Sequence, residues 1–386
     1  MYNVLTLNKI AAVGTERFGK NYSVSDSATD PEAIMVRSAK MHDMEFGKNL
    51  LAIARAGAGV NNIPVDKCAE QGIVVFNTPG ANSNAVKELA ICALLLSSRK
   101  ITEAAAWAAS LKGTPDAPKT VEGGKSKFAG PEIYGKTLGV IGLGAIGGKI
   151  ANAAAALGMK VIGYDPFLSV NAALHLDPSI KVAADINDIY TNSDYITLHV
   201  PYTPDTKNTI DKEQLDMMKD GVRIINLARG ELVNSQEIVK AIADGKVAKY
   251  VTDFADDIVL GVENVIVLPH LGASTPESED NCAVMAADEL KDYIENGNIK
   301  NSVNFPNASM KATGTKVCIL HKNIPNVIAK ITSACGDAGL NIENMVNASK
   351  KDYAYTMLDV AGNVSDDVAN KMNNVEGIIK VRVITK

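Results

Sequence analysis

The sequence predicts an α/β protein with two doubly wound parallel-sheet domains of the Rossmann or flavodoxin-like type and a C-terminal ferredoxin-like domain of βαββαβ order. Three observations predict this class. Short apolar runs alternate with helix-compatible runs in two successive series, a Gly-x-Gly-x-x-Gly motif follows a strand of the second series, and the last 72 residues have a rhythm of their own. A length of 386 residues allows two or three hydrophobic cores.

The first series indicates a parallel sheet at the start of the chain. A helix is expected over residues 65–71. A longer helix is expected over 82–98, with Asn82 or Ser83 as the N-cap, and it could form a hinge between two domains. The strands are expected at 4–7, 33–36, 51–55 and 73–76.

The second series follows a polar surface stretch at 112–127. A long helix ends it, beginning at Thr275, a good N-cap that precedes Pro276 and Glu277, and reaching residue 296. The strands are expected at 137–141, 160–164, 195–200, 222–227, 250–254 and 265–268, and the helices between them at 145–157, 212–218 and 236–243.

The third part begins after a segment of linker composition at 301–314. Its pattern of strand, helix, two strands, helix and strand predicts a separate small domain. The strands are expected at 316–321, 341–349, 353–360 and 378–384, and the helices at 327–338 and 365–373.

Composition argues against several classes of partner. Lys and Arg number 39 against 44 Asp and Glu, so the net charge of −5 offers no basic field to nucleic acid or to a membrane surface. The apolar runs are much shorter than the ~20 residues of a membrane span. Five cysteines lack Cys-x-x-Cys spacing, so we expect no metal site and a reducing, cytoplasmic compartment.

The glycine-rich loop carries the strongest functional signal. It follows an apolar strand and opens a helix, and the next strand ends in an acidic residue, which together predict a dinucleotide site. The first glycine permits a tight turn, the second leaves room for a pyrophosphate, and the third lets helix and sheet approach each other. The loop residues are Gly142, Gly144, Ala145, Ile146 and Gly147.

The acidic residue is Asp165, which would accept hydrogen bonds from the ribose hydroxyls of the adenosine. Pro166 follows it and no Arg stands beside it, so a 2′-phosphate would be repelled. The sequence therefore predicts NAD rather than NADP.

Two further residues stand where strands of this series end, Arg229 after 222–227 and His270 after 265–268. Either alone is usually structural, but together they suit 2-oxoacid reduction. The guanidinium of Arg229 would bind a carboxylate and polarise the carbonyl, while protonated His270 would donate a proton as a hydride arrives.

Residues 1–310 resemble the D-isomer-specific 2-hydroxyacid dehydrogenases, and in particular the members that act on phosphoglycerate. The resemblance rests on blocks in family order: VRSA (36–39), RAGAGVNN (55–62), NTPGANS (77–83), GVIGLGAIG (139–147), GYDP (163–166), LHVPYT (198–203), NLARG (226–230) and PHLGAST (269–275).

The resemblance implies that His270 is the acid and base and that Arg229 contacts the substrate. It implies that Arg37 and Ser38 hold the phosphate, which distinguishes phosphoglycerate members from lactate or glyoxylate relatives. The other implied substrate contacts are Arg55, Gly57, Ala58, Gly59 and Asn82, and the other implied cofactor contacts are Val200, Pro201, Ala228, Asp253 and Gly272.

One position departs from the family pattern. The family carries a Glu that pairs with the catalytic His, and the matching position here is Ile258. We expect Asp257 to replace it through a small shift of the loop; the alternatives are Asp256, or a His270 that works without a carboxylate partner.

The C-terminal part resembles ACT regulatory domains, which bind an amino acid between two chains. The resemblance implies that His321, Asn323 and Asn341 contact an L-serine effector, although these residues could instead merely cap element ends in a dimerising domain.

Taken together, the resemblance implies NAD-dependent oxidation of 3-phospho-D-glycerate to 3-phosphohydroxypyruvate, in a homodimer or homotetramer regulated by L-serine. The alternatives are a hydroxypyruvate or glyoxylate reductase and a non-catalytic NAD-sensing protein. The expected domains are a substrate domain at 1–82 and 283–308, an NAD domain at 83–282 and a regulatory domain at 315–386, with the active-site cleft between the first two.

Overall fold

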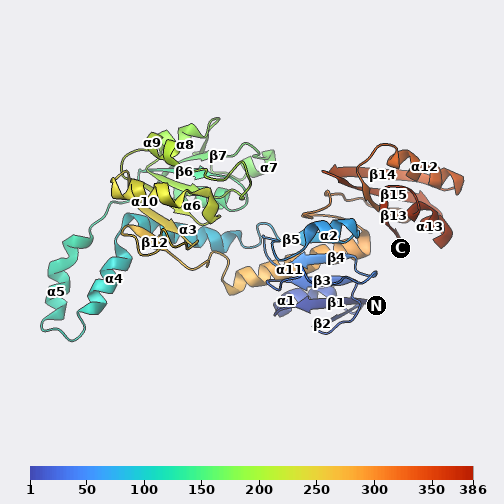
Figure 1. Ribbon diagram of the computed structural model, residues 1–386, viewed down its shortest axis with the longest axis horizontal. Helices are drawn as coiled ribbons and strands as arrows, with labels where there is room; N and C mark the ends of the chain where they lie inside the picture. The colour runs from blue at the N-terminus through green and yellow to red at the C-terminus, as the bar shows by residue number, and fades with distance from the viewer. Residues whose placement is uncertain (386) are drawn as a thin grey trace. The chain divides into compact units, whose positions relative to one another are not determined.

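The computed structural model describes residues 1–385, which fold into two compact units (Figure 1). Unit 1 comprises Met1–Asn82 and the chain from Pro276 onward, and unit 2 comprises Ser83–Thr275. The chain therefore returns from unit 2 to unit 1 at the start of helix α11 (Pro276–Asn296). The expected boundary at 282/283 would instead lie within this helix. The reason is packing, because Ala286, Ala287 and Leu290 of α11 are buried in the core of unit 1.

Unit 1 is built on a five-stranded parallel sheet of order β2-β1-β3-β4-β5, the flavodoxin-like order. Alternate residues of β3 face opposite sides. Ala33 and Met35 join the core that includes α11, whereas Ile34 and Val36 join the core that includes Cys68 of α2. The elements are β1 Tyr2–Leu7, α1 Ala12–Thr15, η1 Glu16–Phe18, β2 Tyr22–Ser25, β3 Ala33–Val36, β4 Ala52–Arg55, α2 Val65–Glu70 and β5 Val74–Asn77.

Unit 2 contains a seven-stranded parallel sheet of order β12-β11-β10-β9-β6-β7-β8, which is the Rossmann order with one additional strand. Its strands are β6 Thr137–Ile141, β7 Lys160–Tyr164, β8 Lys181–Val182, β9 Tyr195–Leu198, β10 Val222–Asn226, β11 Val247–Thr252 and β12 Val265–Val267. Its helices are α3 Ser83–Ser98, α4 Ile101–Ser110, α5 Ala117–Gly124, η2 Lys125–Phe128, α6 Gly147–Ala156, α7 Val170–Ala173, α8 Asn187–Asn192, α9 Lys212–Met217, η3 Gly230–Leu232 and α10 Ser235–Ala243.

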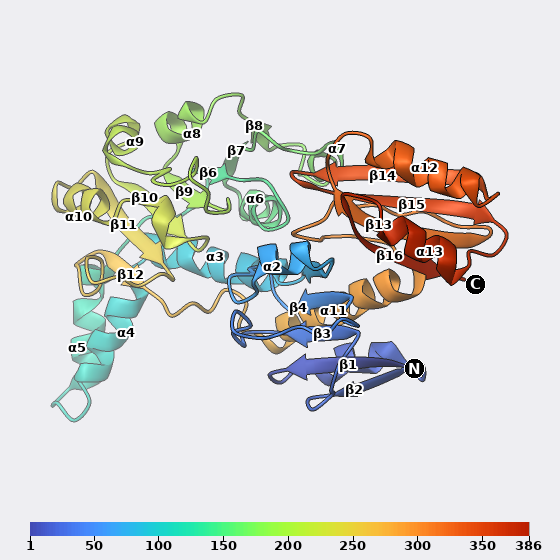
Figure 2. The ribbon, with the colours of Figure 1, turned by 45° about the vertical axis from the view of Figure 1, so that its right-hand side comes forward.

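Helices α4 and α5 form an arm that extends away from the sheet of unit 2 in both views (Figures 1 and 2). The sequence predicted only a polar surface stretch over 112–127. Helix α4 buries none of its side chains, so it has no apolar stripe from which a helix could be read. The arm is held by Trp107, whose ring lies 5.2 Å from that of Phe128 and against Gly124.

The C-terminal part of unit 1 is an antiparallel sheet of order β14-β15-β13-β16 with α12 and α13 on one face, which is ferredoxin-like. The predicted fold class is confirmed in all three parts. The elements are β13 Thr315–Lys322, α12 Val327–Asp337, β14 Asn341–Lys350, β15 Tyr353–Ala361, α13 Asp366–Asn373 and β16 Ile378–Ile384.

The segment at 301–314, expected to be a linker, is packed instead. Phe305 is fully buried, and the side chain of Asn304 accepts a bond from Val75 N at 2.9 Å and donates to Ile73 O at 2.8 Å. The segment therefore covers the edge of β5, and its polar composition reflects hydrogen bonding to that strand rather than exposure to water.

Within unit 1, the C-terminal sheet is tied to the end of α11. The guanidinium of Arg382 donates to the carbonyls of Tyr293 and Ile294 and lies 4.7 Å from the ring of Tyr293. Helix ends leave carbonyls without partners, so a buried Arg at this position stabilises the end of α11.

None of the helices in the described part of the chain combines the length and hydropathy of a membrane span, and no three potential metal ligands gather there.

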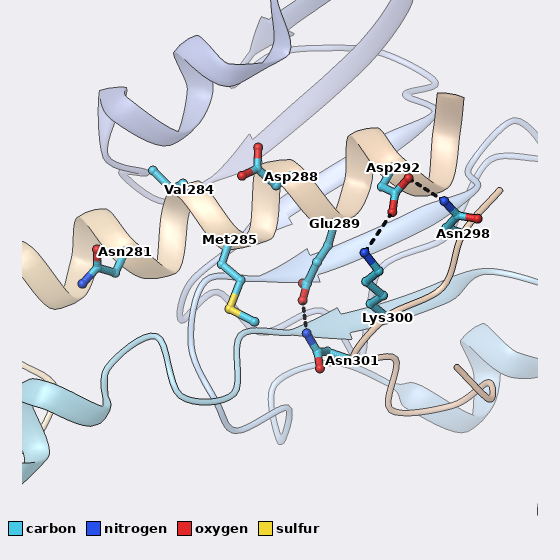
Figure 3. A pocket seen from close by; sticks show the side chains of 9 residues that line it. All are labelled: Asn281, Val284, Met285, Asp288, Glu289, Asp292, Asn298, Lys300 and Asn301. Atoms are coloured by element: carbon cyan, nitrogen blue, oxygen red, sulfur yellow. Dashed lines mark hydrogen bonds and ion pairs between the residues drawn. The ribbon is translucent and has the colours of Figure 1, made fainter. Parts of the chain in front are cut away.

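Helix α11 also lines a hollow of about 460 Å³, in which Glu289 points toward Asn301 and Asp292 toward Lys300 and Asn298 (Figure 3). Glu289 is only 8% exposed, and one of its oxygens accepts a bond from Asn301 at 2.7 Å while the other has no partner among the described residues. Burial raises the pKa of Glu289 to about 8, so the folded protein holds it protonated at neutral pH.

Glu289→Gln should therefore flatten the pH dependence of stability. Between the ordinary Glu pKa and about pH 8, the unfolded chain has lost this proton and the folded chain keeps it, so wild-type stability falls as pH rises, by at most ~1.4 kcal/mol per pH unit. The variant lacks this loss, and urea unfolding at pH 5 and pH 8 measures it. Glu277→Gln, exposed on the same helix, is the control; equal slopes in wild type and Glu289→Gln would refute the assignment.

Candidate functional site

The predicted cofactor and catalytic residues of unit 2 gather at one edge of its sheet. All the strands are parallel, so the segments that follow them emerge on the same side. The glycine loop follows β6, Asp165 and Pro166 follow β7, Val200 and Pro201 follow β9, Ala228 and Arg229 follow β10, Asp253 follows β11, and His270 and Gly272 follow β12.

The glycine loop has the shape that a dinucleotide pyrophosphate requires. Gly142 has φ +93°, and a Cβ there would lie 2.6 Å from the carbonyl oxygen of His199, so only glycine fits. A Cβ on Gly147 would lie 1.8 Å from the oxygen of Gly142, because the loop folds tightly onto the start of α6. A Cβ on Gly144 would meet no atom within 4 Å, so this glycine faces open space where a phosphate could approach.

Asp165 is held against the same loop. One carboxylate oxygen accepts a bond from Leu143 N at 2.9 Å and the other from Phe167 N at 2.9 Å. These bonds fix the carboxylate at the end of β7 and leave further lone pairs for the ribose hydroxyls. The loop and Asp165 therefore fit NAD, while the preference for NAD over NADP stays a prediction.

His270 and the turn at Arg229 are linked through Phe254. The ring of His270 stands edge-on to that of Phe254, with centroids 4.8 Å apart, and a Cβ on Gly230 would lie 3.3 Å from the Cβ of Phe254. The exposed Arg229 donates to the carbonyl of Ala228 at 2.6 Å. Phe254 thus contacts both the ring of His270 and the turn that carries Arg229.

The turn that carries Arg229 is set by Asn226, a buried residue that the sequence interpretation missed. Its amide donates to the carbonyl of Arg229 at 2.8 Å, and its oxygen accepts from Ala228 N at 3.2 Å. A polar side chain at the last position of an apolar strand is the signal that could have identified it.

A second histidine, His199, also lies at this edge but cannot serve as a proton donor. Burial lowers its pKa to about 3, so the ring is neutral, and Nε2 lies 2.8 Å from the hydroxyl of Thr197. His270, in contrast, is exposed. The geometry therefore favours His270 as the group that exchanges protons with a substrate.

Asp253 is the buried acid closest to this chemistry. It is 3% exposed, and neither oxygen has a hydrogen-bond partner of good geometry among the described residues. Burial raises the pKa of Asp253, while the charges of His270 and, more weakly, Arg229 act in the opposite direction.

The expected pairing of Asp257 with His270 is not formed. Asp257 is exposed and has no ion pair to His270 within residues 1–385, and Ile258 beside it is 42% exposed. Asp256 is committed elsewhere, since it accepts bonds from Ser235 and from the backbone of Ile258 and Val259. Asp256 likewise forms no ion pair with His270 within residues 1–385, but for a different reason, because its oxygens cap the turn.

In unit 1, Arg37 and Ser38 follow β3, as expected for groups at a strand end. The Nη2 atom of Arg37 lies 2.6 Å from Oε1 of Glu279, in the first turn of α11. The amides of Ser38 and Ala39 donate to the side chain of Asn8, at 3.0 and 2.6 Å. The sequence interpretation missed both Asn8 and Glu279, since they are distant in the chain from the strand end they bind.

Arg55 organises these loops. Its Nε donates to the carbonyl of Arg37 at 2.9 Å and its Nη1 to the carbonyl of Gly59, so it joins the two segments expected to hold the substrate. The amide of Gly57 is already used by the carbonyl of Arg55, whereas those of Ala58 and Gly59 donate to no described group. Of the predicted anchor, only these two amides remain available.

Asn82 ends unit 1, and its buried Oδ1 has no partner among the described residues. An amide oxygen left without a donor in a protein interior is costly, so a donor supplied by a ligand would be accommodated there.

In the C-terminal sheet, the residues expected to bind an amino acid do not converge within one chain. His321 pairs with Ala354 and Asn341 with Ala361, which places them ~23 Å apart along β15. His321 is buried, with Nδ1 2.8 Å from Lys322 O and Nε2 2.9 Å from Thr356 Oγ1, and the side chain of Asn323 donates to Lys351 O. A ligand that contacts both ends of the sheet would need a second copy of the chain.

Comparison with known proteins assigns the chain to a family. Residues 91–272 match the family model described as D-isomer specific 2-hydroxyacid dehydrogenase, NAD binding domain, which confirms NAD as the cofactor. A D-3-phosphoglycerate dehydrogenase of Methanocaldococcus jannaschii is 36% identical over 78% of this chain and 57% of its own length. A hydroxypyruvate reductase of Thermotoga maritima is 38% identical over 67% of this chain and 83% of its own length.

Solved structures show the same fold. The NAD⁺-bound 3-phosphoglycerate dehydrogenase of Entamoeba histolytica is 25% identical, with a TM-score of 0.60, and the match covers 80% of this chain and 99% of that one. The chain spans little more than half the length of the first curated relatives it matches. The chain belongs to the D-isomer-specific 2-hydroxyacid dehydrogenases.

Proposed function

We propose that this protein catalyses the NAD-dependent oxidation of 3-phospho-D-glycerate to 3-phosphohydroxypyruvate, the entry to L-serine synthesis by phosphorylated intermediates. Two separate observations support the proposal: Arg229 and His270 follow strands of unit 2, and Arg37 and Ser38, an arginine and a hydroxyl suited to a phosphate, follow a strand of unit 1. Relatives named D-3-phosphoglycerate dehydrogenase support it.

The proposed roles follow from charge and exposure. Arg229 binds the substrate carboxylate and polarises the C2 oxygen, and the amides of Ala58 and Gly59 provide a second anchor for the carboxylate. His270 removes the hydroxyl proton in oxidation and returns it in reduction, which its exposed ring allows. The glycine loop and Asp165 would hold NAD, which would supply the acceptor for the hydride of C2.

The acid that assists His270 is then Asp253 rather than Asp257. Asp253 is buried, and the positive charge of His270 opposes the rise that burial causes in the pKa of Asp253, so the two side chains are close enough to interact. Ile258 cannot supply a charge, and Asp257 lies in water. Asp253 was also predicted to contact the cofactor, so its carboxyl would lie between His270 and NAD.

Reduction of unphosphorylated hydroxypyruvate is the second candidate, because a hydroxypyruvate reductase is among the relatives. Arg37 and Ser38 argue against it, since that substrate has no phosphate for them to bind. A non-catalytic NAD-sensing protein would have no need for both Arg229 and His270.

NADH oxidation separates these functions. With 3-phosphohydroxypyruvate, wild type should show a kcat/KM at least ~10 times that with hydroxypyruvate, and Arg37→Ala should raise the KM for the phosphorylated substrate by ~10-fold or more, because a charge-assisted phosphate bond is lost. Its KM for hydroxypyruvate should not change. Arg17→Ala, which removes another exposed arginine of unit 1, is the control.

Equal kcat/KM values for the two substrates in wild type would favour the reductase. The absence of turnover with both substrates would favour the NAD-sensing alternative.

For the C-terminal domain, we propose L-serine feedback in a homodimer or homotetramer, with the effector bound where His321 and Asn323 of one copy meet Asn341 of another. The separation of these residues along β15 within one chain supports a shared site. The arm of α4 and α5, which buries almost none of its own side chains, offers a second contact between copies through unit 2.

Isothermal titration should then detect L-serine binding to the wild-type oligomer. Asn341→Ala should weaken it by ~10-fold, because the exposed amide of Asn341 would lose its hydrogen bonds to the effector, and Asn370→Ala, exposed on α13, should not. A titration of wild type without heat of binding would remove the regulatory proposal and leave the catalytic one intact.

A further inference from the structure

We infer that Glu279 is an internal competitor for the substrate's phosphate: its carboxylate occupies Arg37 in the free protein and so sets how strongly the chain prefers a phosphorylated substrate. The inference deepens the proposed function and rests on the role proposed there for Arg37.

The ion pair is short and accessible. Nη2 of Arg37 and Oε1 of Glu279 are 2.6 Å apart, and the two side chains are 44% and 43% exposed. Arg37 stands at the end of β3 and Glu279 in the first turn of α11, so both backbones are fixed by regular elements. A dissolved anion can therefore reach the guanidinium, one nitrogen of which is already in contact with Glu279.

Other donors at this strand end are already in use. The amides of Ser38 and Ala39 donate to Asn8, and Arg55 donates to the carbonyls of Arg37 and Gly59. The donors left for a phosphate are the guanidinium of Arg37 and the hydroxyl of Ser38. A phosphate that binds Arg37 thus meets a guanidinium that is already paired with a carboxylate instead of a free cation.

The carboxylate of Glu279 must weaken the binding of a phosphate to Arg37. A phosphate monoester carries close to two negative charges at neutral pH, and a carboxylate that stays within a few ångströms repels it. Because both side chains are half exposed, water screens the effect, and we expect a factor of ~3 to 10. Hydroxypyruvate places no charge near Arg37 and should not sense Glu279.

The test compares wild type with Glu279→Gln, which keeps the size and polarity of the side chain and removes its charge. Glu277→Gln is the matched control, because Glu277 is exposed in the same helical turn and forms no ion pair within residues 1–385. The readouts are KM for 3-phosphohydroxypyruvate, KM for hydroxypyruvate, and the Kd of 3-phospho-D-glycerate measured by calorimetry without turnover.

Glu279→Gln is expected to lower KM and Kd for the phosphorylated ligands by ~3 to 10-fold, with KM for hydroxypyruvate and kcat unchanged, and the gain should shrink when Arg37→Ala is added. Unchanged or weaker binding of 3-phospho-D-glycerate by Glu279→Gln, or an equal effect on hydroxypyruvate, would overturn the inference. If wild type turns over neither substrate, the proposed function fails, and the calorimetric comparison still decides the role of Glu279.

Discussion

The parallel pairing of strands in the sheet of unit 2 is the constraint on which the candidate site depends. Parallel strands send the segments that follow them to one edge, so six separate segments meet there although 128 residues separate Gly142 from His270. The order in which the strands follow one another reverses between β6 and β9, and this reversal leaves the glycine loop after β6 open at that edge. The packing of Gly142 against the carbonyl of His199 joins the two strands where the cofactor loop begins.

Much of this arrangement could be predicted from the sequence, because the strands are short, apolar and punctuated by glycine. The strands β3, β6, β7 and β16 begin and end at the predicted residues. The arm of α4 and α5 could not be predicted in the same way, since a helix without a buried face shows no hydrophobic period. The segment at 301–314 was misread because asparagine and serine favour both loops and the edges of strands.

The candidate site shows where sequence reasoning reaches its limit. Residue identity predicted the strand-end groups Arg229 and His270, and the family resemblance added Arg37, but neither predicted the partner of Arg37. Glu279 lies 242 positions from Arg37, and only the packing of α11 against the sheet of unit 1 brings them together. Likewise, the loss of the family's Glu at Ile258 was visible in the sequence, while burial, which a sequence does not display, distinguishes Asp253 from Asp257.

The most direct test of the catalytic site is the steady-state oxidation of NADH with 3-phosphohydroxypyruvate by His270→Gln. Removing the proton donor should lower kcat by ~100-fold or more, while the Kd for NADH, measured by its fluorescence, should stay within twofold of wild type. A kcat close to that of wild type would contradict the assignment of His270 as the acid and base of this chain.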